Sequence, residues 1–168
     1  MSSVVTFTHS HMKRSHDNPQ AGLPVPANPE WRIGIVYSDF YKEEIETMIS
    51  YARKALLESG VRAEHISLHP ASGSFEIPLL GAALAQKKSV DALIGLGIIV
   101  EGETEHARLV AENTVRGIMD IQVRYAVPFA CEVLYVSAMH VATERLNKGV
   151  YAAHCVLHSL AQLEGMRS

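Results

Sequence analysis

A short polar segment that ends in a histidine is the first place in the sequence where chemistry could occur. Residues 100–106 read Val-Glu-Gly-Glu-Thr-Glu-His and lie between an apolar run and a long stretch with helical periodicity. A glycine and a threonine that open a helix offer backbone N–H groups and a hydroxyl to an anion. The imidazole of His106 could act as an acid or base beside that anion. A capped helix start with a surface histidine fits the local pattern equally well.

Two other segments carry groups suited to a flat, polar ligand. Residues 73–78 read Gly-Ser-Phe-Glu-Ile-Pro, where the Glu76 carboxylate could bind polyol hydroxyls or complement a helix dipole. Phe40 and Tyr41 follow an apolar run, so they could stack on a heterocycle, or one of them could pack beneath the loop. This loop contains no glycine, which argues against a dinucleotide fingerprint and a flavodoxin-style phosphate loop.

An anion site among three glutamates needs a cation from elsewhere in the chain. Arg145 is the predicted cation, because a guanidinium grips a phosphate with two parallel hydrogen bonds. The alternative is a surface arginine paired with Glu144 or Glu103. No convincing set of metal ligands is evident, so no metal is expected.

These candidate residues lie between segments that alternate strand and helix periodicity. Strands are predicted at 32–37, 66–70, 91–99 and 129–136, and helices at 45–56, 77–87, 105–125, 139–146 and 149–163. The alternation predicts an α/β fold of the flavodoxin-like kind, a three-layer αβα sandwich around a four-stranded parallel sheet. Ligands bind at the carboxyl ends of the strands in such sheets, where the candidate segments fall.

Composition narrows the classes of protein and of partner. The 168 residues carry a formal charge of −3 with scattered basic residues, which disfavours nucleic-acid binding. The longest apolar runs are strand-sized and too short to span a membrane. Cys131 and Cys155 show no CxxC spacing and are interpreted as buried free thiols in a reducing compartment. The N-terminus lacks an apolar signal region, so a cytoplasmic location is expected.

The first thirty residues differ from the rest of the chain. They hold four of the seven prolines and show neither strand nor helix periodicity. We therefore predict an arm over residues 1–30, either mobile or lying on a neighbouring subunit, and a domain over residues 31–168. Val4, Val5 and Phe7 could add an edge strand to a neighbour's sheet.

Taken together, the segments resemble the lumazine synthase family of riboflavin biosynthesis. Residues 73–78 are similar to the family's P-G-[AS]-[FY]-E-[IL]-P, and residues 97–106 are similar to G-x-[VL]-I-x-G-x-T-x-H. The likeness runs from about residue 32 to 163 and is greatest to archaeal members. It implies condensation of 5-amino-6-(D-ribitylamino)uracil with 3,4-dihydroxy-2-butanone 4-phosphate to 6,7-dimethyl-8-ribityllumazine, by a transferase that uses no cofactor or metal.

The resemblance also implies roles for individual residues and an assembly. His106 would shuttle protons, and the phosphate would be held by Gly102, the Glu103 backbone, Thr104 and, from an adjacent subunit, Arg145. Substrate-binding roles are implied for Phe40, Ser74, Phe75, Glu76, Ile98, Ile99, Val100 and, from a neighbouring subunit, Cys131. The family forms pentamers with sites at subunit interfaces, and some members form decamers or icosahedral 60-subunit capsids.

Several residues depart from the family pattern. Tyr41 stands where asparagine is usual, Ala107 where an aromatic is common, and Cys131 with Glu132 where an aromatic and glycine are common. The alternative interpretation is therefore a pentameric shell or paralogue that binds a flavin-like ligand without turnover.

Overall fold

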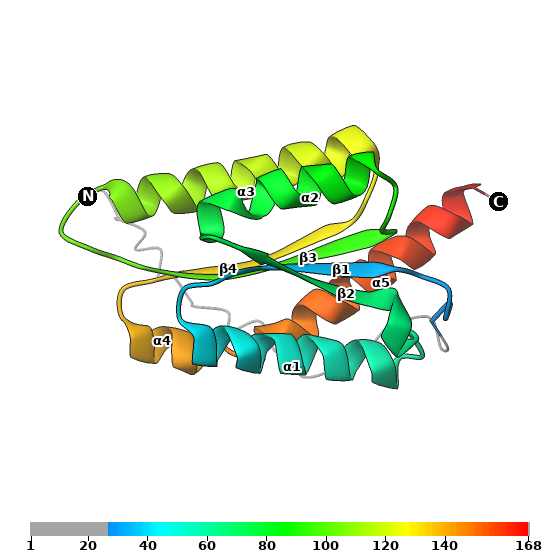
Figure 1. Cartoon of the computed structure of the whole chain (residues 1–168), viewed down its shortest axis with the longest axis horizontal. Coiled ribbons are helices and arrows are strands. Elements are labelled where there is room, and N and C mark those ends of the chain that lie inside the picture. Colours follow the sequence, from blue (N-terminus) through cyan, green and yellow to red (C-terminus); the bar gives the residue numbers. More distant parts are fainter. Residues whose placement is uncertain (1–26, 168) are drawn as a thin grey trace, which may run out of the picture.

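A four-stranded parallel sheet forms the centre of the computed structural model, which describes residues 27–167 (Figure 1). The strands are β1 (Ile33–Ser38), β2 (Ile66–Ala71), β3 (Ala92–Val100) and β4 (Phe129–Val136), in the order β2-β1-β3-β4. All three pairings are parallel. The first eight residues of β3 are buried, as expected of a central strand covered on both faces. The predicted fold class is confirmed.

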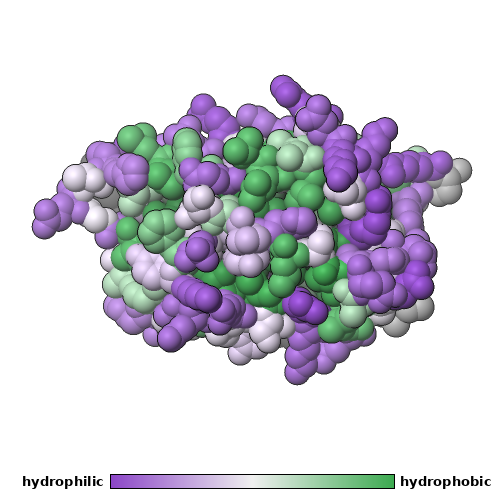
Figure 2. Space-filling view, viewed as in Figure 1, coloured by the Kyte–Doolittle hydropathy of each residue, from purple (hydrophilic) through white to green (hydrophobic). Residues whose placement is uncertain are grey.

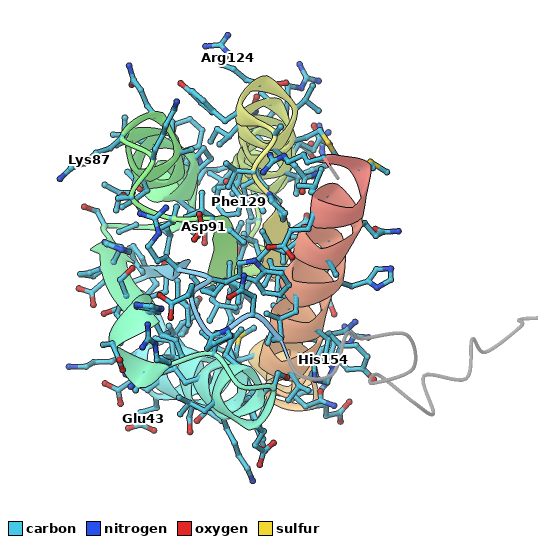
Figure 3. All side chains as sticks on the ribbon, turned by 90° about the vertical axis from the view of Figure 1, so that its right-hand side faces the viewer. Glu43, Lys87, Asp91, Arg124, Phe129 and His154 are labelled. Atoms are coloured by element: carbon cyan, nitrogen blue, oxygen red, sulfur yellow. The ribbon has the colours of Figure 1, made fainter. Side chains whose placement is uncertain are left out.

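Helices cover both faces of the sheet. On one face lie α1 (Lys42–Glu58), α4 (Met139–Thr143) and α5 (Lys148–Arg167), and on the other lie α2 (Ile77–Gln86) and α3 (His106–Tyr125). Two short 3₁₀ turns, η1 (Ala63–His65) and η2 (Ser74–Glu76), precede β2 and α2. Figure 3 looks along the strands from their amino ends and shows the sheet between the two helical layers.

Each face of the sheet has its own apolar cluster. Ile35, Ile94 and Leu96 pack with α1 and α5, whereas Val36, Leu93 and Phe129 pack with α2 and α3. At Gly149, α5 approaches α1 so closely that an added Cβ would collide with the Met48 carbonyl oxygen. This contact requires glycine, and it brings the two helices together beneath the sheet.

Element boundaries differ from the prediction by a few residues. α1 begins at Lys42 rather than at residue 45. Its first turn is polar and contributes nothing to the core, so the apolar periodicity did not reveal it. The helix predicted at 139–146 ends at Thr143, since residues 144–147 form turns before α5. β4 has the predicted bounds.

The prediction that both cysteines are buried is wrong for Cys155. Both are free thiols, but Cys131 is partly exposed and Cys155 is exposed. Cys155 lies outside the stripe of α5 that faces the core, which contains Ala152, Val156 and Leu157.

Residues 27–30, the end of the predicted arm, pack on the domain. The Ala27 N–H donates to the Ser59 carbonyl at 2.9 Å, and Ala27 is buried. The following residue, Trp31, donates from its indole N–H to Glu164 at 2.8 Å. The rest of the predicted arm, including Val4, Val5 and Phe7, lies outside the described residues.

The surface between the helical layers is partly apolar. Figure 2 shows hydrophobic side chains along this band, where β2 is an edge strand of the sheet and Leu68 is exposed. None of the helices described is long and apolar enough to cross a membrane.

Candidate active site

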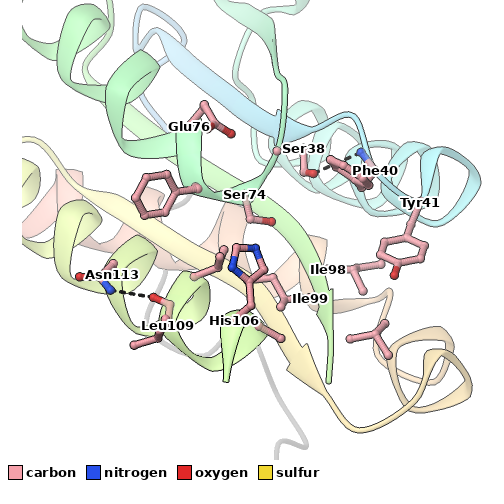
Figure 4. Close-up of a pocket in the computed structure, with 15 residues that line it drawn as sticks. Ser38, Phe40, Tyr41, Ser74, Glu76, Ile98, Ile99, His106, Leu109 and Asn113 are labelled. Atoms are coloured by element: carbon pink, nitrogen blue, oxygen red, sulfur yellow. Dashed lines mark hydrogen bonds between the residues drawn. The ribbon is translucent and has the colours of Figure 1, made fainter. Parts of the chain in front are cut away.

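A pocket of about 610 Å³ opens at the carboxyl ends of β1 and β3 (Figure 4). From β1 the chain continues into α1 on one face of the sheet, and from β3 it continues into α3 on the other. Such a change of side between neighbouring strands is where parallel α/β sheets bind ligands. The pocket is lined by Ser38, Phe40, Tyr41, Gly73, Ser74, Phe75, Glu76, Ile98, Ile99, Val100, His106, Ala107, Leu109, Val110 and Asn113.

Eight residues predicted to bind substrate or transfer protons line this one pocket. They come from three separate segments, namely Phe40; Ser74, Phe75 and Glu76; and Ile98, Ile99, Val100 and His106. In Figure 4, His106 and Leu109 lie on the opposite side of the pocket from Phe40 and Tyr41. A small molecule in this pocket would therefore contact all three segments.

The first two turns of α3 contribute lining residues that the sequence analysis did not assign to the site. Leu109, Val110 and Asn113 follow His106 at intervals of three, four and seven residues, so they share its helix face. The Asn113 amide donates to the Leu109 carbonyl at 2.7 Å. Helical spacing counted from His106 is the signal that could have found them.

Phe40 and Tyr41 both face the pocket. Their exposed fractions are 62% and 40%, so neither packs beneath the loop. The Phe40 ring lies over Gly73, where an added Cβ would be 3.5 Å from a ring carbon. The Ser38 hydroxyl accepts the Phe40 N–H at 3.2 Å and holds this turn. An aromatic face is thus presented to the pocket.

Tyr41 has a backbone conformation that tyrosine rarely adopts. Its φ and ψ are 56° and 55°, in the left-handed region, which costs an L-residue with a bulky side chain roughly 1–2 kcal/mol. Its carbonyl accepts the Ile45 N–H at 3.0 Å, which starts α1. The turn therefore fixes a strained conformation at a residue whose side chain lines the pocket.

Replacing Tyr41 with asparagine is expected to stabilise the fold. Asparagine enters the left-handed region more readily, so the free energy of unfolding should rise by about 1 kcal/mol. Urea unfolding at a fixed protein concentration measures it. Tyr51→Asn is the matched control, since Tyr51 is similarly exposed at 42% but lies within α1. A Tyr41 variant less stable than the parent would mean that the ring's contacts outweigh the backbone strain.

The predicted phosphate segment lies beside the pocket but does not line it. Gly102, Glu103 and Thr104 are exposed in the loop between β3 and α3. Within residues 27–167, the Gly102 and Glu103 amides donate to no backbone carbonyl. The Thr104 hydroxyl accepts the His106 N–H at 3.4 Å. These groups are at the N-terminal end of α3, where N–H groups favour an anion.

Arg108 compensates part of the acidic charge near this loop. Its guanidinium bonds to Glu105 and Glu112 at 2.6 Å each, along one face of α3. These two carboxylates raise the pKa of the exposed Arg108 side chain, so it stays charged. One of the three glutamates that surround the segment is thereby paired.

Arg145 lies away from the pocket of its own chain. It is exposed in the connection between α4 and α5, the layer opposite α3. Among the described residues it forms no ion pair, so the alternative pairing with Glu144 or Glu103 is not found. Its guanidinium is available to another molecule.

Cys131 also lies outside the pocket. It packs with Phe129 against the cluster beneath α2 and α3, and burial raises the pKa of its thiol. Burial likewise raises the pKa of the Glu132 carboxyl, an effect that the nearby Lys148 charge opposes. Neither group is part of the surface that holds His106. Nowhere in residues 27–167 do three His, Cys, Asp or Glu side chains cluster so that they could hold a metal ion.

Comparisons with known proteins match most of the chain to one family. The family model described as 6,7-dimethyl-8-ribityllumazine synthase matches residues 30–164. A protein of that name from Porphyromonas gingivalis is 34% identical over 145 residues, which cover 83% of this chain and 89% of that protein. One from Acidovorax ebreus is 35% identical over 133 residues, covering 79% and 86%. One from Parabacteroides distasonis is 34% identical over 134 residues, covering 77% and 84%. All three sources are bacterial, whereas the sequence motifs looked most similar to archaeal ones.

Proposed function

Since this chain belongs to the 6,7-dimethyl-8-ribityllumazine synthase family, we propose that the pocket at the carboxyl ends of β1 and β3 is its active site. The chain is a transferase of riboflavin biosynthesis. It condenses 5-amino-6-(D-ribitylamino)uracil with 3,4-dihydroxy-2-butanone 4-phosphate to 6,7-dimethyl-8-ribityllumazine. One observation carries the proposed location: three motif segments far apart in sequence line a single pocket.

The pyrimidine substrate fits the side of the pocket opposite α3. The exposed Phe40 ring would stack on the pyrimidine, while Ile98, Ile99 and Val100 would form the apolar edge. The ribityl chain would bind along Ser74–Glu76, where a hydroxyl and a carboxylate offer partners for its hydroxyls. A volume of about 610 Å³ is in the usual range for sites that bind small molecules.

The phosphate of the second substrate would sit at the amino end of α3. The Gly102 and Glu103 amides and the Thr104 hydroxyl would cradle it, and the dipole of a 20-residue helix favours an anion there. Arg145 of the same chain is in the opposite helical layer, so we propose that an adjacent subunit supplies this cation. Cys131 would reach the pocket from a neighbouring subunit in the same way.

The reaction requires several proton transfers in one place. The pyrimidine's amine attacks the ketone and one water leaves as the imine forms. Inorganic phosphate is then eliminated, and ring closure releases the second water. His106 lines the pocket at the start of α3, where its imidazole would donate and accept these protons. Holding both substrates face to face supplies much of the remaining rate acceleration.

The activity is tested directly by incubation with both substrates. The absorbance and fluorescence of the lumazine product should appear, with one phosphate released per product. Product formation would also exclude the alternative of a non-catalytic shell. Binding of the pyrimidine without any turnover would support that alternative instead.

Oligomeric assembly accompanies this family, and we propose a pentamer as the unit, from which a decamer or an icosahedral 60-subunit capsid could be built. Exposed apolar side chains support this: Val115, Met119 and Val123 recur every four residues along α3, and Leu79 of α2 is 69% exposed. A stripe of this kind is suited to burial against other subunits.

Native mass spectrometry at micromolar concentration should therefore give a multiple of five subunits. Val123→Glu should reduce the assembly, because it places a charge in the apolar stripe. Arg124→Ala, at the neighbouring exposed position, is the matched control and should leave the mass unchanged. A stable monomer for the parent protein would contradict the proposal.

We also propose that residues 1–30 act as an arm that is partly ordered on a neighbouring subunit, and that residues 31–168 form the catalytic domain. The edge strand β2 could accept a strand from such an arm, and exposed Leu68 lies on it. The free thiols of Cys131 and Cys155 are consistent with the proposed location in the cytoplasm, a reducing compartment.

A further inference from the structure

One polar atom of the pocket is buried without a partner. The Ser74 side chain is 6% exposed, and its Oγ makes no hydrogen bond within the described part of the chain. An unpaired buried hydroxyl costs roughly 1–3 kcal/mol, so such groups are rare unless they have a function. Serine at this position therefore lowers stability unless something binds to it.

The Ser74 hydroxyl lies against β3 at a glycine, Gly97. An added Cβ at Gly97 would lie 2.5 Å from Ser74 Oγ, so a larger residue there would displace the hydroxyl. Ser74 lines the pocket with His106 and Ile98, and Figure 4 shows it near the centre of the site. Ser74 thus borders the pocket, with its hydroxyl oxygen packed against β3 and almost without exposed surface.

The backbone of Ser74 is held by a residue that does not line the pocket. Thr114 is fully buried on α3, two turns after His106, and its hydroxyl donates to the Ser74 carbonyl at 3.2 Å. The same carbonyl accepts the N–H of Ile77, the first residue of α2. This carbonyl therefore joins the η2 turn to both α2 and α3.

With the polyol contact of Ser74 taken from the proposed function, we infer that Thr114 is the positioning residue that keeps the Ser74 segment in place. This inference rests on the proposed location of the active site. A threonine hydroxyl in the interior of a helix has no stabilising value of its own unless it is paired. The bond to Ser74 gives it a partner and also fixes α3, which bears His106, relative to the loop that binds the polyol. Positioning before binding lowers the ordering cost when substrate arrives.

Thr114→Val tests the inference, because valine keeps the shape and removes the hydroxyl. The Kd of the pyrimidine substrate, measured alone by calorimetry, should rise about five-fold, the equivalent of one lost hydrogen bond. Thr114→Ser retains the donor and should restore the Kd to within about two-fold. The KM of the phosphorylated substrate should change little in both variants.

Two further variants separate positioning from a general loss of stability. Ile118→Val removes a methyl group one turn further along α3, outside the pocket, and should lower stability without changing the pyrimidine Kd. Ser74→Ala should also raise the Kd of the pyrimidine substrate. Adding Thr114→Val to Ser74→Ala should have less effect on that Kd than Thr114→Val alone, because Thr114 acts through the contact that Ser74 makes with the substrate.

The outcomes distinguish this inference from the proposed site itself. If Thr114→Val leaves the pyrimidine Kd unchanged, or Thr114→Ser fails to restore it, while Phe40→Ala raises it, the site stands and the role of Thr114 is wrong. If the effects of Ser74→Ala and Thr114→Val on the pyrimidine Kd simply add in the double variant, Thr114 does not act through Ser74 and its proposed role is likewise wrong. If neither Phe40→Ala nor Ser74→Ala changes the Kd, the proposed location of the active site is wrong.

Discussion

Arg145→Ala is expected to weaken binding of the phosphorylated substrate by roughly 2–4 kcal/mol, the cost of losing a buried, charge-assisted pair. The guanidinium is a fixed cation and cannot move protons, so its contribution should be confined to holding the phosphate. The Kd of the pyrimidine substrate should barely change. Binding constants for each substrate, measured separately on parent and variant, provide the test.

Arg145→Lys is an informative companion variant. Lysine keeps the charge but cannot form two parallel hydrogen bonds, so it should restore only part of the affinity. Arg116→Ala is the matched control, because Arg116 is exposed on α3 and lies outside the pocket. If Arg145→Ala leaves the affinity for the phosphorylated substrate intact, the assignment of the phosphate subsite is wrong.

Local periodicity was sufficient to predict the layers of this fold. The strands are short apolar runs between turn residues, and the helices repeat apolar residues on one face, so both patterns are visible without tertiary information. β4 is the clearest case, because Pro128 precedes it and Ser137 follows it. Periodicity does not give the order of the strands, which the structure shows to be β2-β1-β3-β4.

The residues of the candidate site could be predicted where they are consecutive in the sequence. The segments that contain Ser74, Glu76 and His106 carry motifs in strand-end loops, and the fold brings such loops to one edge of the sheet. Asn113 lies outside these consecutive motifs, and only helical spacing counted from His106 indicates that it shares the face of α3 that lines the pocket. The bond between Thr114 and Ser74 joins residues 40 positions apart and depends on how α3 packs.

The backbone strain at Tyr41 also could not be predicted from the sequence. Nothing in the segment Asp39-Phe40-Tyr41-Lys42 indicates that tyrosine must adopt a left-handed conformation, because the turn into α1 imposes it. Likewise, Cys155 has apolar neighbours in the sequence, yet the rotation of α5 leaves it exposed. In both cases tertiary packing, rather than residue type, decides the outcome.

His106→Ala should lower turnover and leave substrate binding intact, whereas Arg145→Ala should act on binding. Both substrates should still bind, because the imidazole contributes proton transfer rather than the main binding contacts. Turnover should fall by roughly 10- to 1000-fold, since one proton-transfer group is lost while uncatalysed condensation of the bound substrates continues. Steady-state kcat and the two substrate binding constants separate these effects. His140→Ala, at an exposed histidine of α4, is the control and should retain full turnover.

Co-expression of the two single variants then tests whether His106 and Arg145 of one site come from different subunits. If they do, random mixing of His106→Ala and Arg145→Ala subunits should produce intact sites at about one quarter of interfaces, and activity should reappear. If both residues served the same chain's pocket, every site in the mixture would lack one of them and activity would stay at the level of the single variants. The position of Arg145 in the helical layer opposite α3 predicts that activity returns.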